Sequence, residues 1–346
     1  MPMTETRVRI NGINVAHPPL RLPQAEAARA IGALTLNPRR AAALARGTQI
    51  EQRAIALTAG EVLALGAAGA RNDVYQRIAP GLAIDAARGV LGEADVSRMA
   101  CLVTSSCTGY SVPSWGVDVA EAFRMPACTA RLPITEAGCA GGVVALARAV
   151  DHLRTRPGAS GLAVAVELCS LAFHPGGDDG NLTSTLIFGD GAGAALLQTG
   201  DGPGLEVVDT ASRLVPDTKH ALGFALTDQG LYPILTRDLP DLLGEPTREA
   251  VLELLYRNGI TTRDIGAWLL HPGGARILKT LEDGFGLDRC QTHWSWDSMR
   301  EFGNTSSAAI FDVMRRYFQD RRPGEYAVVA AFGPGLSIEL MLVRAQ

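Results

Sequence analysis

Three polar residues of this 346-residue chain, Cys139, His271 and Asn304, are of types that together carry out acyl-thioester chemistry. A thiol supplies a nucleophile, an imidazole a base, and an amide a hydrogen-bond donor for a developing oxyanion. Each residue lies where an apolar segment or a loop gives way to a helical pattern flanked by glycine. Taken singly, each is equally explained as a buried cysteine, a histidine bonded to the backbone or a helix cap. Their joint occurrence favours a nucleophilic active site.

Cys139 stands at the expected N-terminus of a helix. An apolar strand ends in the small residues around it, and a run of Val, Leu and Ala with helical period follows at 143–150. The unpaired N–H groups and the dipole at such a terminus favour an anion, so we expect the thiol to lean towards thiolate. The glycines on either side, at 138 and 141–142, would let a substrate carbonyl approach the sulfur.

Two further segments carry polar or glycine-rich sequence next to apolar runs. Residues 105–110 follow an apolar strand at 99–104, and polar side chains at the end of a buried strand commonly bind ligands, although an ordinary loop fits equally well. An apolar segment at 183–188 leads into a GxGxG pattern at 189–193, but no helix follows as a dinucleotide-binding motif requires. We therefore predict a structural glycine turn at 188–193.

Strands and helices alternate along the chain, which predicts an α/β fold with largely buried sheets. The expected strands are residues 8–15, 99–104, 159–167, 194–198, 265–270, 326–332 and 336–343. The expected helices are residues 24–46, 58–69, 78–92 with Pro80 in the first turn, 246–258, 275–283 and a segment that ends at 316. A glycine-rich break at 199–205 places the boundary between two halves, 1–200 and 201–346.

The composition excludes several classes of function. A net charge of −4 and the lack of a Lys or Arg run argue against a nucleic-acid surface. The six cysteines show neither CxxC pairs nor the spacing of metal ligands, which predicts no metal site and a reducing compartment. No apolar segment approaches the ~20 residues of a membrane span, and the N-terminus lacks the pattern of a signal peptide. We expect a cytoplasmic protein with no membrane or nucleic-acid partner.

Five motifs, in order along most of the chain, resemble those of the type III polyketide synthases, the chalcone synthase-like family of the thiolase-fold superfamily. They are Gly-Cys-Ala-Gly-Gly at 138–142, Phe-Gly-Asp-Gly-Ala at 188–192, His-Pro-Gly-Gly at 271–274, Gly-Asn-Thr-Ser-Ser-Ala at 303–308 and Phe-Gly-Pro-Gly-Leu-Ser-Ile-Glu at 332–339. The resemblance implies a thiolase-like fold of two similar α/β halves, stacked as five αβαβα layers. It also implies a homodimer.

The resemblance further implies roles for four residues. Cys139 would be the nucleophile that carries acyl groups, His271 and Asn304 would complete its triad, and Phe188 would be a gatekeeper between a CoA tunnel and the reaction cavity. Such an enzyme loads a starter from acyl-CoA, extends it with malonyl-CoA by decarboxylative Claisen condensation, and cyclises the product, here to a pyrone or resorcinol type. CoA thioesters are its substrates and no other cofactor is implied. His271 would hold Cys139 as a thiolate–imidazolium pair.

Alignment with the same family carries over further positions. The second gatekeeper falls on Pro233, where plant members have Phe, so the gate is altered and a medium- or long-chain starter is favoured. The cavity-lining positions are Cys107, Cys169, Ser184, Phe224 and Ser306, and Val112 would reach the partner subunit. CoA phosphates would meet Arg40, Arg46 and Arg276, although helix arginines commonly just face solvent. The cysteines at 107 and 169 resemble bacterial members of the family.

Three rival functions differ in their sequence features. A ketoacyl-ACP synthase III shares the fold and the Cys-His-Asn set, but it usually has His-Gln-Ala-Asn where this chain has His-Pro-Gly-Gly at 271–274. A papain-like protease fits the spacing from Cys139 to His271, but the CGSCW motif of that class is missing here. A non-catalytic thiolase-fold scaffold should have lost a member of the triad, and none is lost.

Overall fold

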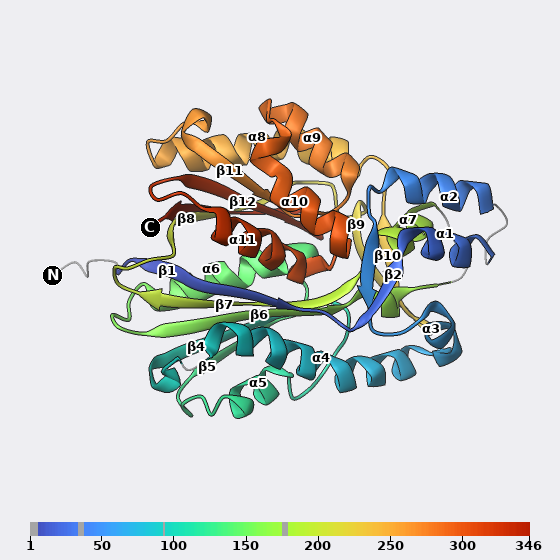
Figure 1. Ribbon diagram of the computed structural model, residues 1–346, viewed down its shortest axis with the longest axis horizontal. Coiled ribbons are helices and arrows are strands. Elements are labelled where there is room, and N and C mark those ends of the chain that lie inside the picture. Colours follow the sequence, from blue (N-terminus) through green and yellow to red (C-terminus); the bar gives the residue numbers. More distant parts are fainter. Residues whose placement is uncertain (1–5, 34–37, 93, 175–178) are drawn as a thin grey trace.

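The computed structural model describes residues 6–33, 38–92, 94–174 and 179–346 (Figure 1). The elements of the first half are β1 (Val8–Ala16), β2 (Leu20–Pro23), α1 (Gln24–Ala33), α2 (Pro38–Gly47), β3 (Gln52–Ile55), α3 (Ala59–Leu65), α4 (Ala68–Leu91), β4 (Met99–Ser105), α5 (Gly116–Ala122), β5 (Ala130–Ile134), α6 (Gly141–Leu153), β6 (Ser160–Leu168), α7 (Asp179–Ile187) and β7 (Asp190–Thr199). Those of the second half are β8 (Leu205–Leu214), β9 (Leu222–Thr227), β10 (Gly230–Leu235), α8 (Leu239–Arg257), β11 (Ile265–Leu270), α9 (Ala275–Phe285), α10 (Arg289–Phe302), α11 (Ala309–Asp320), β12 (Tyr326–Gly333) and β13 (Ser337–Ala345).

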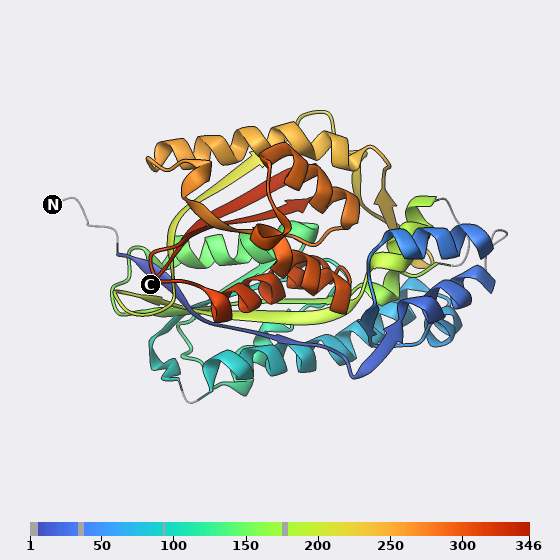
Figure 2. The same cartoon turned by 45° about the horizontal axis from the view of Figure 1, so that its top comes forward.

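Helices cover and separate two groups of strands (Figures 1 and 2). Helices α8 and α9 lie on the outer face of the group that contains β11, β12, β13 and β8. Helices α4 and α5 lie on the opposite outer face, against β7, β6 and β4. Helices α6 and α11 pack between the two groups. The α/β class and the five αβαβα layers expected for this chain are therefore confirmed.

Nine of the described strands form one hydrogen-bonded sheet in the order β11-β12-β13-β8-β1-β7-β6-β4-β5. The two groups meet where β1 lies beside β8, with Arg9 paired to Glu206 and Ile10 to Leu205. This short contact lets each group twist over its own helices. The loop between β7 and β8 falls within the break at 199–205, while the division into domains at 1–200 and 201–346 stays a prediction.

The two faces of each strand group are buried against different helices. In β6, Ala163 and Ala165 belong to the central core with α6 and α11, whereas Leu162 and Val164 pack with α4. Side chains alternate across a strand, so a strand covered on both sides must be apolar throughout. Every residue of β6 is buried, including the charged Glu167 near its end. The buried strands thus fix the positions of the loops that follow them.

Most expected strands and helices are present, but two expectations are wrong, and the sequence pattern assigns the apolar segment at 183–188 to no element. Helix α4 begins at Ala68, so Pro80 lies well inside the helix and not in its first turn. The apolar segment at 183–188 mostly belongs to helix α7. The glycine turn expected at 188–193 is not present, since β7 begins at Asp190 and includes Gly191 and Gly193. A Cβ on Gly193 would lie 2.4 Å from the Cβ of Phe311. Glycine there allows α11 to pack directly on the strand.

Candidate active site

Cys139 lies in a short 3-10 turn, Gly138–Ala140, immediately before α6. The expected place at a helix N-terminus is confirmed. The glycines around it make room for neighbouring parts of the chain. A Cβ on Gly138 would lie 2.4 Å from Pro334, one on Gly141 2.1 Å from the Ser105 hydroxyl, and one on Gly142 2.3 Å from the Ser307 carbonyl oxygen. Close packing, and not only substrate approach, therefore requires glycine at these positions.

The Cys139 thiol is held in its neutral form by its surroundings. Its Sγ donates a hydrogen bond to the Ser306 Oγ at 3.4 Å. Burial raises the pKa of Cys139 to about 11; the Ser306 hydrogen bond opposes this rise, the charge of Glu167 adds to it, and the Asn304 side chain again opposes it. The lean towards thiolate expected from the helix dipole is thus outweighed by the desolvation of the buried sulfur.

His271 follows the last residue of β11, and its backbone N–H donates to the Ala330 carbonyl oxygen of β12 at 2.7 Å. The side chain is only 2% exposed. Neither ring nitrogen has a hydrogen-bond partner among the described residues. Burial lowers the pKa of His271 to about 3, so the ring is neutral. A buried imidazole with two unused nitrogens is ready to exchange a proton with a bound substrate or with a nearby thiol.

The Asn304 amide lies between the other two residues. Its Oδ1 accepts from the Ser306 N–H at 2.8 Å, which leaves Nδ2 aimed at the Gly273 carbonyl oxygen across a long 3.5 Å contact. Gly273 itself lies against the His271 ring, since a Cβ on it would be 3.2 Å from the His271 Cδ2. The same amide lowers the pKa of Cys139. The fold therefore brings the three expected catalytic residues to one place.

Glu167 is a further residue of this site that sequence reasoning missed. Its carboxylate is fully buried, and burial raises its pKa. It accepts hydrogen bonds from the Ser106 hydroxyl at 3.3 Å, the Cys107 N–H at 3.1 and 3.2 Å, the Cys107 thiol at 3.4 Å, the Thr108 hydroxyl at 2.7 Å and the Ser307 hydroxyl at 2.5 Å. A charged residue at the end of an otherwise apolar strand was the available signal, because a buried charge needs such partners.

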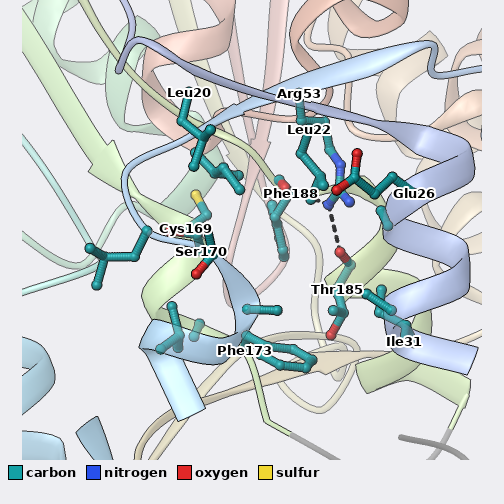
Figure 3. Close-up of a pocket in the computed structure, with 18 of the residues that line it drawn as sticks. Leu20, Leu22, Glu26, Ile31, Arg53, Cys169, Ser170, Phe173, Thr185 and Phe188 are labelled. Atoms are coloured by element: carbon teal, nitrogen blue, oxygen red, sulfur yellow. Dashed lines mark hydrogen bonds between the residues drawn. The ribbon is translucent and has the colours of Figure 1, made fainter. Parts of the chain in front are cut away.

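An apolar pocket of about 280 Å³ lies beyond Phe188 (Figure 3). We define it by its lining, which includes Leu20, Leu22, Ala27, Ile31, Arg53, Ile55, Leu57, Val62, Cys169, Ala172, Phe173, Ser184, Phe188 and Pro233. Phe188 stands in the middle of the view, between Cys169 and Arg53. The lining comes from α1, α3, α7 and the small β2–β3 and β9–β10 sheets, which gather at one end of the molecule (Figure 1).

A second hollow, the arginine pocket, has a volume of about 410 Å³. Its lining includes Arg40, Leu44, Thr183, Ile187, Leu235, Arg237, Gly273, Gly274 and Arg276. It reaches Gly273, which contacts both His271 and Asn304. Positive charge at its rim and the backbone of Gly273 and Gly274 at its base would suit an anionic ligand that brings a reacting group inwards.

Helix α7 is the wall between the two pockets. Ser184, Thr185 and Phe188 line the apolar pocket, whereas Thr183 and Ile187 line the arginine pocket. Residues three or four apart share one face of a helix, so these two sets face different directions. The Phe188 backbone also pairs with Asn304. Phe188 is therefore held beside the candidate catalytic residues and at the edge of the apolar pocket.

The structure places most of the residues carried over by alignment near this site. Cys169, Ser184, Phe188 and Pro233 line the apolar pocket, Arg40 and Arg276 line the arginine pocket, and Cys107 and Ser306 lie beside Cys139, with the Cys107 Sγ 3.5 Å from the Ser306 Oγ. Cys139, His271 and Asn304 themselves line neither pocket. A side-chain movement at Phe188 or Ile187 would be needed to join either pocket to them.

Three of these residues lie elsewhere. Arg46 lines a separate hollow between α1 and α2, so it does not share the arginine pocket with Arg40. Phe224 is paired with Pro233 across the β9–β10 hairpin but lies one strand farther out and lines none of these hollows. Val112 is 76% exposed, away from the cavities of its own chain.

The described part of the chain contains no group of three or more His, Cys, Asp or Glu side chains able to hold a metal ion. No helix in the described ranges has the length and apolar character needed to cross a membrane.

Two family models match consecutive parts of the sequence. Residues 44–203 match the N-terminal domain of the chalcone and stilbene synthases, and residues 206–346 match the C-terminal domain. A 1,3,6,8-tetrahydroxynaphthalene synthase from Streptomyces peucetius is 32% identical over 348 residues, which cover 97% of this chain and 92% of the relative.

Solved structures agree with the fold. The 1,3,6,8-tetrahydroxynaphthalene synthase of Streptomyces coelicolor superposes with a TM-score of 0.90 at 28% identity, over 98% of this chain and 99% of that one. A polyketide synthase of the brown alga Ectocarpus siliculosus superposes with a TM-score of 0.92 over the whole of both chains, at 24% identity. The second likeness bears on the fold alone.

Proposed function

The chain belongs to the chalcone and stilbene synthase family of type III polyketide synthases, and we propose that Cys139 is the residue on which it builds its polyketide. One observation carries this proposal. The Cys139 thiol, an unpartnered His271 ring and the Asn304 amide converge beside Gly273, which lines the arginine pocket. Because His271 and Asn304 are buried and neither ring nitrogen of His271 has a partner among the described residues, this geometry is better explained by chemistry than by stability.

In the loading step, Cys139 attacks the thioester carbonyl of an acyl-CoA. The proton of the thiol passes to His271, and His271 returns it to the departing CoA sulfur. Burial keeps each group neutral when alone. Proton transfer between them creates a pair of opposite charges, whose attraction offsets part of the desolvation that each charge would otherwise face. The expected thiolate–imidazolium pair is thus proposed as a state of the reacting enzyme, which substrate binding promotes.

In the extension step, malonyl-CoA loses carbon dioxide while its thioester oxygen accepts hydrogen bonds from His271 and Asn304. The electron pair of the broken carbon–carbon bond stays on the enolate, and the enolate carbon then attacks the acyl carbonyl on Cys139. The bond between that carbonyl and the Cys139 Sγ breaks, so Cys139 leaves as a thiolate and the lengthened chain remains on CoA. The Asn304 Nδ2 is suited to this role because the Ser306 N–H holds the other end of the amide. Hydrogen bonds stabilise the enolate in these steps, so the proposed mechanism uses CoA thioesters as substrates and needs no other cofactor.

The starter class follows from the apolar pocket. Its volume of about 280 Å³ is near the lower end of the roughly 300–1,000 Å³ typical of ligand pockets. Its wall is mostly aliphatic and it lies directly behind Phe188, so a medium-chain acyl group would fill it once Phe188 turns aside. We propose a medium-chain acyl-CoA starter and a pyrone or resorcinol-type product.

Arg40 and Arg276 are the proposed contacts to CoA phosphates, together with Arg237. All three are exposed and line the pocket that leads to Gly273. Arginine is well suited to phosphate recognition because its planar guanidinium offers two parallel donors. Arg46 is not part of this proposal, since it lines a different hollow.

A homodimer and a cytoplasmic location, where CoA thioesters are made, complete the proposal. The loop before α5 supports the dimer. The Tyr110 backbone is held by the Asn72 side chain at 2.8 and 2.9 Å, and yet Val112 beside it is 76% exposed. A fixed loop that presents an aliphatic side chain to solvent is suited to burial against a second copy. Val112→Asp should shift the protein towards monomer in sedimentation equilibrium, whereas Tyr256→Asp, at an exposed tyrosine of α8, should not.

The test of the function is intact-protein mass spectrometry after incubation with acyl-CoAs of graded chain length, followed by malonyl-CoA and extraction of products. Wild type should gain one acyl group and release a cyclised polyketide, best with a medium-chain starter. Cys139→Ala should gain none but should still release carbon dioxide from malonyl-CoA. Cys290→Ala, at an exposed cysteine, should behave as wild type. An acyl adduct that persists in Cys139→Ala would show that Cys139 is not the nucleophile.

A further inference from the structure

Arg53 is a buried cation in the wall of the apolar pocket (Figure 3). It lies on β3 and is 3% exposed. Its Nη1 donates to two backbone carbonyl oxygens at the C-terminal end of α7, that of Thr185 at 2.5 Å and that of Phe188 at 2.9 Å. Its Nε has no acceptor among the described residues. Arg53 is therefore hydrogen-bonded, through one edge of its guanidinium, to the backbone of residues 185–189, which we call the Phe188 segment.

Stability alone gives a poor account of this arrangement. Burial lowers the pKa of the Arg53 guanidinium to about 10, and the nearby Asp190 carboxylate offsets only part of that effect. A buried charge with an unused donor costs stability, and an apolar side chain of similar size in an apolar wall commonly serves the fold better. Such groups are sometimes retained because they fix one geometry among several. A role in holding one local geometry would explain why Arg53 is retained.

The segment that Arg53 holds is paired with Asn304. The Asn304 N–H donates to the Ile187 carbonyl oxygen at 2.8 Å, and the Gly189 N–H donates to the Asn304 carbonyl oxygen at 3.0 Å. The backbone on both sides of Phe188 thus carries Asn304 on its other edge. Any shift of the α7 end would be passed to the Asn304 backbone through these two hydrogen bonds.

The stem of Arg53 also packs against the residue before Asn304. A Cβ on Gly303 would lie 2.9 Å from the Arg53 Cγ and 2.5 Å from the Ile187 carbonyl oxygen, and Gly303 has a φ of 70°. Space and backbone conformation both demand glycine there. The Asn304 loop is consequently pressed against Arg53 on one side and hydrogen-bonded to the Phe188 segment on the other.

We propose that Arg53 is a positioning residue, which sets the Phe188 segment and thereby the Asn304 amide that stabilises the enolate. It touches no reacting atom in this arrangement. The inference rests on the proposed function, in which Asn304 serves decarboxylation and Cys139 serves loading. The two steps should therefore respond differently when Arg53 is changed.

The test compares carbon dioxide release from malonyl-CoA with acyl loading of Cys139 from acetyl-CoA, whose acyl group is too short to fill the apolar pocket that Arg53 lines. A displacement of about 1 Å in a catalytic group can lower a rate by roughly a hundredfold. Arg53→Met should therefore lower the kcat of carbon dioxide release by about 10- to 100-fold, with KM for malonyl-CoA and the loading rate within about threefold of wild type. Arg53→Lys, which keeps the charge but lacks the fork, should fall between the two.

A matched control and a rescue separate positioning from general damage. Arg71 is also buried, at 5% exposed, and its Nη1 also donates to two carbonyl oxygens, those of Leu171 and Phe173, but it does not hold the Phe188 segment. Arg71→Met should keep carbon dioxide release at the wild-type level per folded molecule. Arg53→Ala leaves a space that opens on the apolar pocket. Added methylguanidinium should therefore restore part of the carbon dioxide release of Arg53→Ala, and it should not raise that of Arg71→Ala.

The proposal is overturned if Arg53→Met, or Arg53→Lys should the former not fold, keeps carbon dioxide release within about threefold of wild type. It is equally overturned if release and loading fall by the same factor and methylguanidinium restores neither. A wild-type enzyme that releases no carbon dioxide would instead refute the proposed function, and this inference with it.

Discussion

The substitution Asn304→Asp keeps the hydrogen-bond acceptor of the side chain and removes its donor, so it tests the two ends of the amide independently. In the structure Oδ1 accepts from the Ser306 N–H at 2.8 Å, while Nδ2 is the end proposed to donate to the enolate. Aspartate keeps the shape and the acceptor but replaces the donor by a second carboxylate oxygen. Loss of one oxyanion donor costs about 2.7–4 kcal/mol, or 10²–10³ in kcat. Ionised Asn304→Asp should lose at least this much, because its charge also repels the enolate.

The same variant should recover as the pH falls. A protonated carboxyl group can donate a hydrogen bond where an ionised one cannot, as a neutral acid does in other oxyanion holes. Burial raises the pKa of Asp190, another buried carboxyl of this chain, and burial at position 304 should likewise raise the pKa of the introduced carboxyl above its usual value. Carbon dioxide release by Asn304→Asp should therefore increase as the pH falls, through protonation of that carboxyl group.

The assay is carbon dioxide release from malonyl-CoA between about pH 5 and 8, with wild type and Asn304→Ala measured alongside. Asn304→Ala has no group to protonate, so it should stay low by about 10²–10³ across the range. The reasoning fails if Asn304→Ala keeps nearly full activity, since the amide would then be no donor. It also fails if both variants show the same pH dependence, because the recovery would then belong to another group.

Three further predictions concern CoA binding, starter length and the acidity of the nucleophile. Arg276→Ala should raise KM for acyl-CoA by several-fold and weaken its salt dependence, whereas Arg46→Ala should change neither, as steady-state kinetics at two ionic strengths will test. Ala172→Leu should fill part of the apolar pocket, shorten the preferred starter in a competition between acyl-CoAs, and destabilise the protein by about 1–3 kcal/mol. The Glu167 charge raises the pKa of Cys139, so Glu167→Gln should move the pH profile of Cys139 alkylation towards lower pH, and a shift towards higher pH would contradict that assignment.

The positions of Cys139, His271 and Asn304 could be predicted from the sequence because each residue lies next to a recognisable pattern of glycine and apolar residues. Cys139 precedes a helix and His271 follows a buried strand, and turns of this kind are visible as glycine next to apolar runs. Glu167 could not be assigned in the same way. Its partners are scattered, and Ser307 lies 140 positions away along the chain. Only the pairing of the strands brings them together, and the hydrophobic pattern does not report which loops will meet.

Arg53 was missed for a related reason. A single arginine in a short strand such as β3 is ordinarily a solvated residue, and the sequence around it gives no sign of burial. Its burial follows from the small β2–β3 sheet and from the end of α7 lying over it, both of which depend on tertiary packing. The glycines at 189 and 303 were visible in the sequence, but the contacts that require them were not: a Cβ on Gly303 would meet Arg53 and the Ile187 carbonyl oxygen, and one on Gly189 would meet the Phe302 carbonyl oxygen.

The CoA-binding prediction shows a constraint that the sequence already contained. Arg40 and Arg46 lie six residues apart in α2, and at 3.6 residues per turn they point about 120° away from each other. Side chains that point in such different directions do not line the same pocket. Arg40 lines the arginine pocket, together with Ala43, Leu44 and Gly47 at helical spacing, whereas Arg46 lines another hollow. The same rule divides α7 between the arginine pocket and the apolar pocket. Under the proposed function, the acyl chain and its CoA would lie on different sides of α7, with the thioester at the end of that helix, where Phe188 and Asn304 are paired.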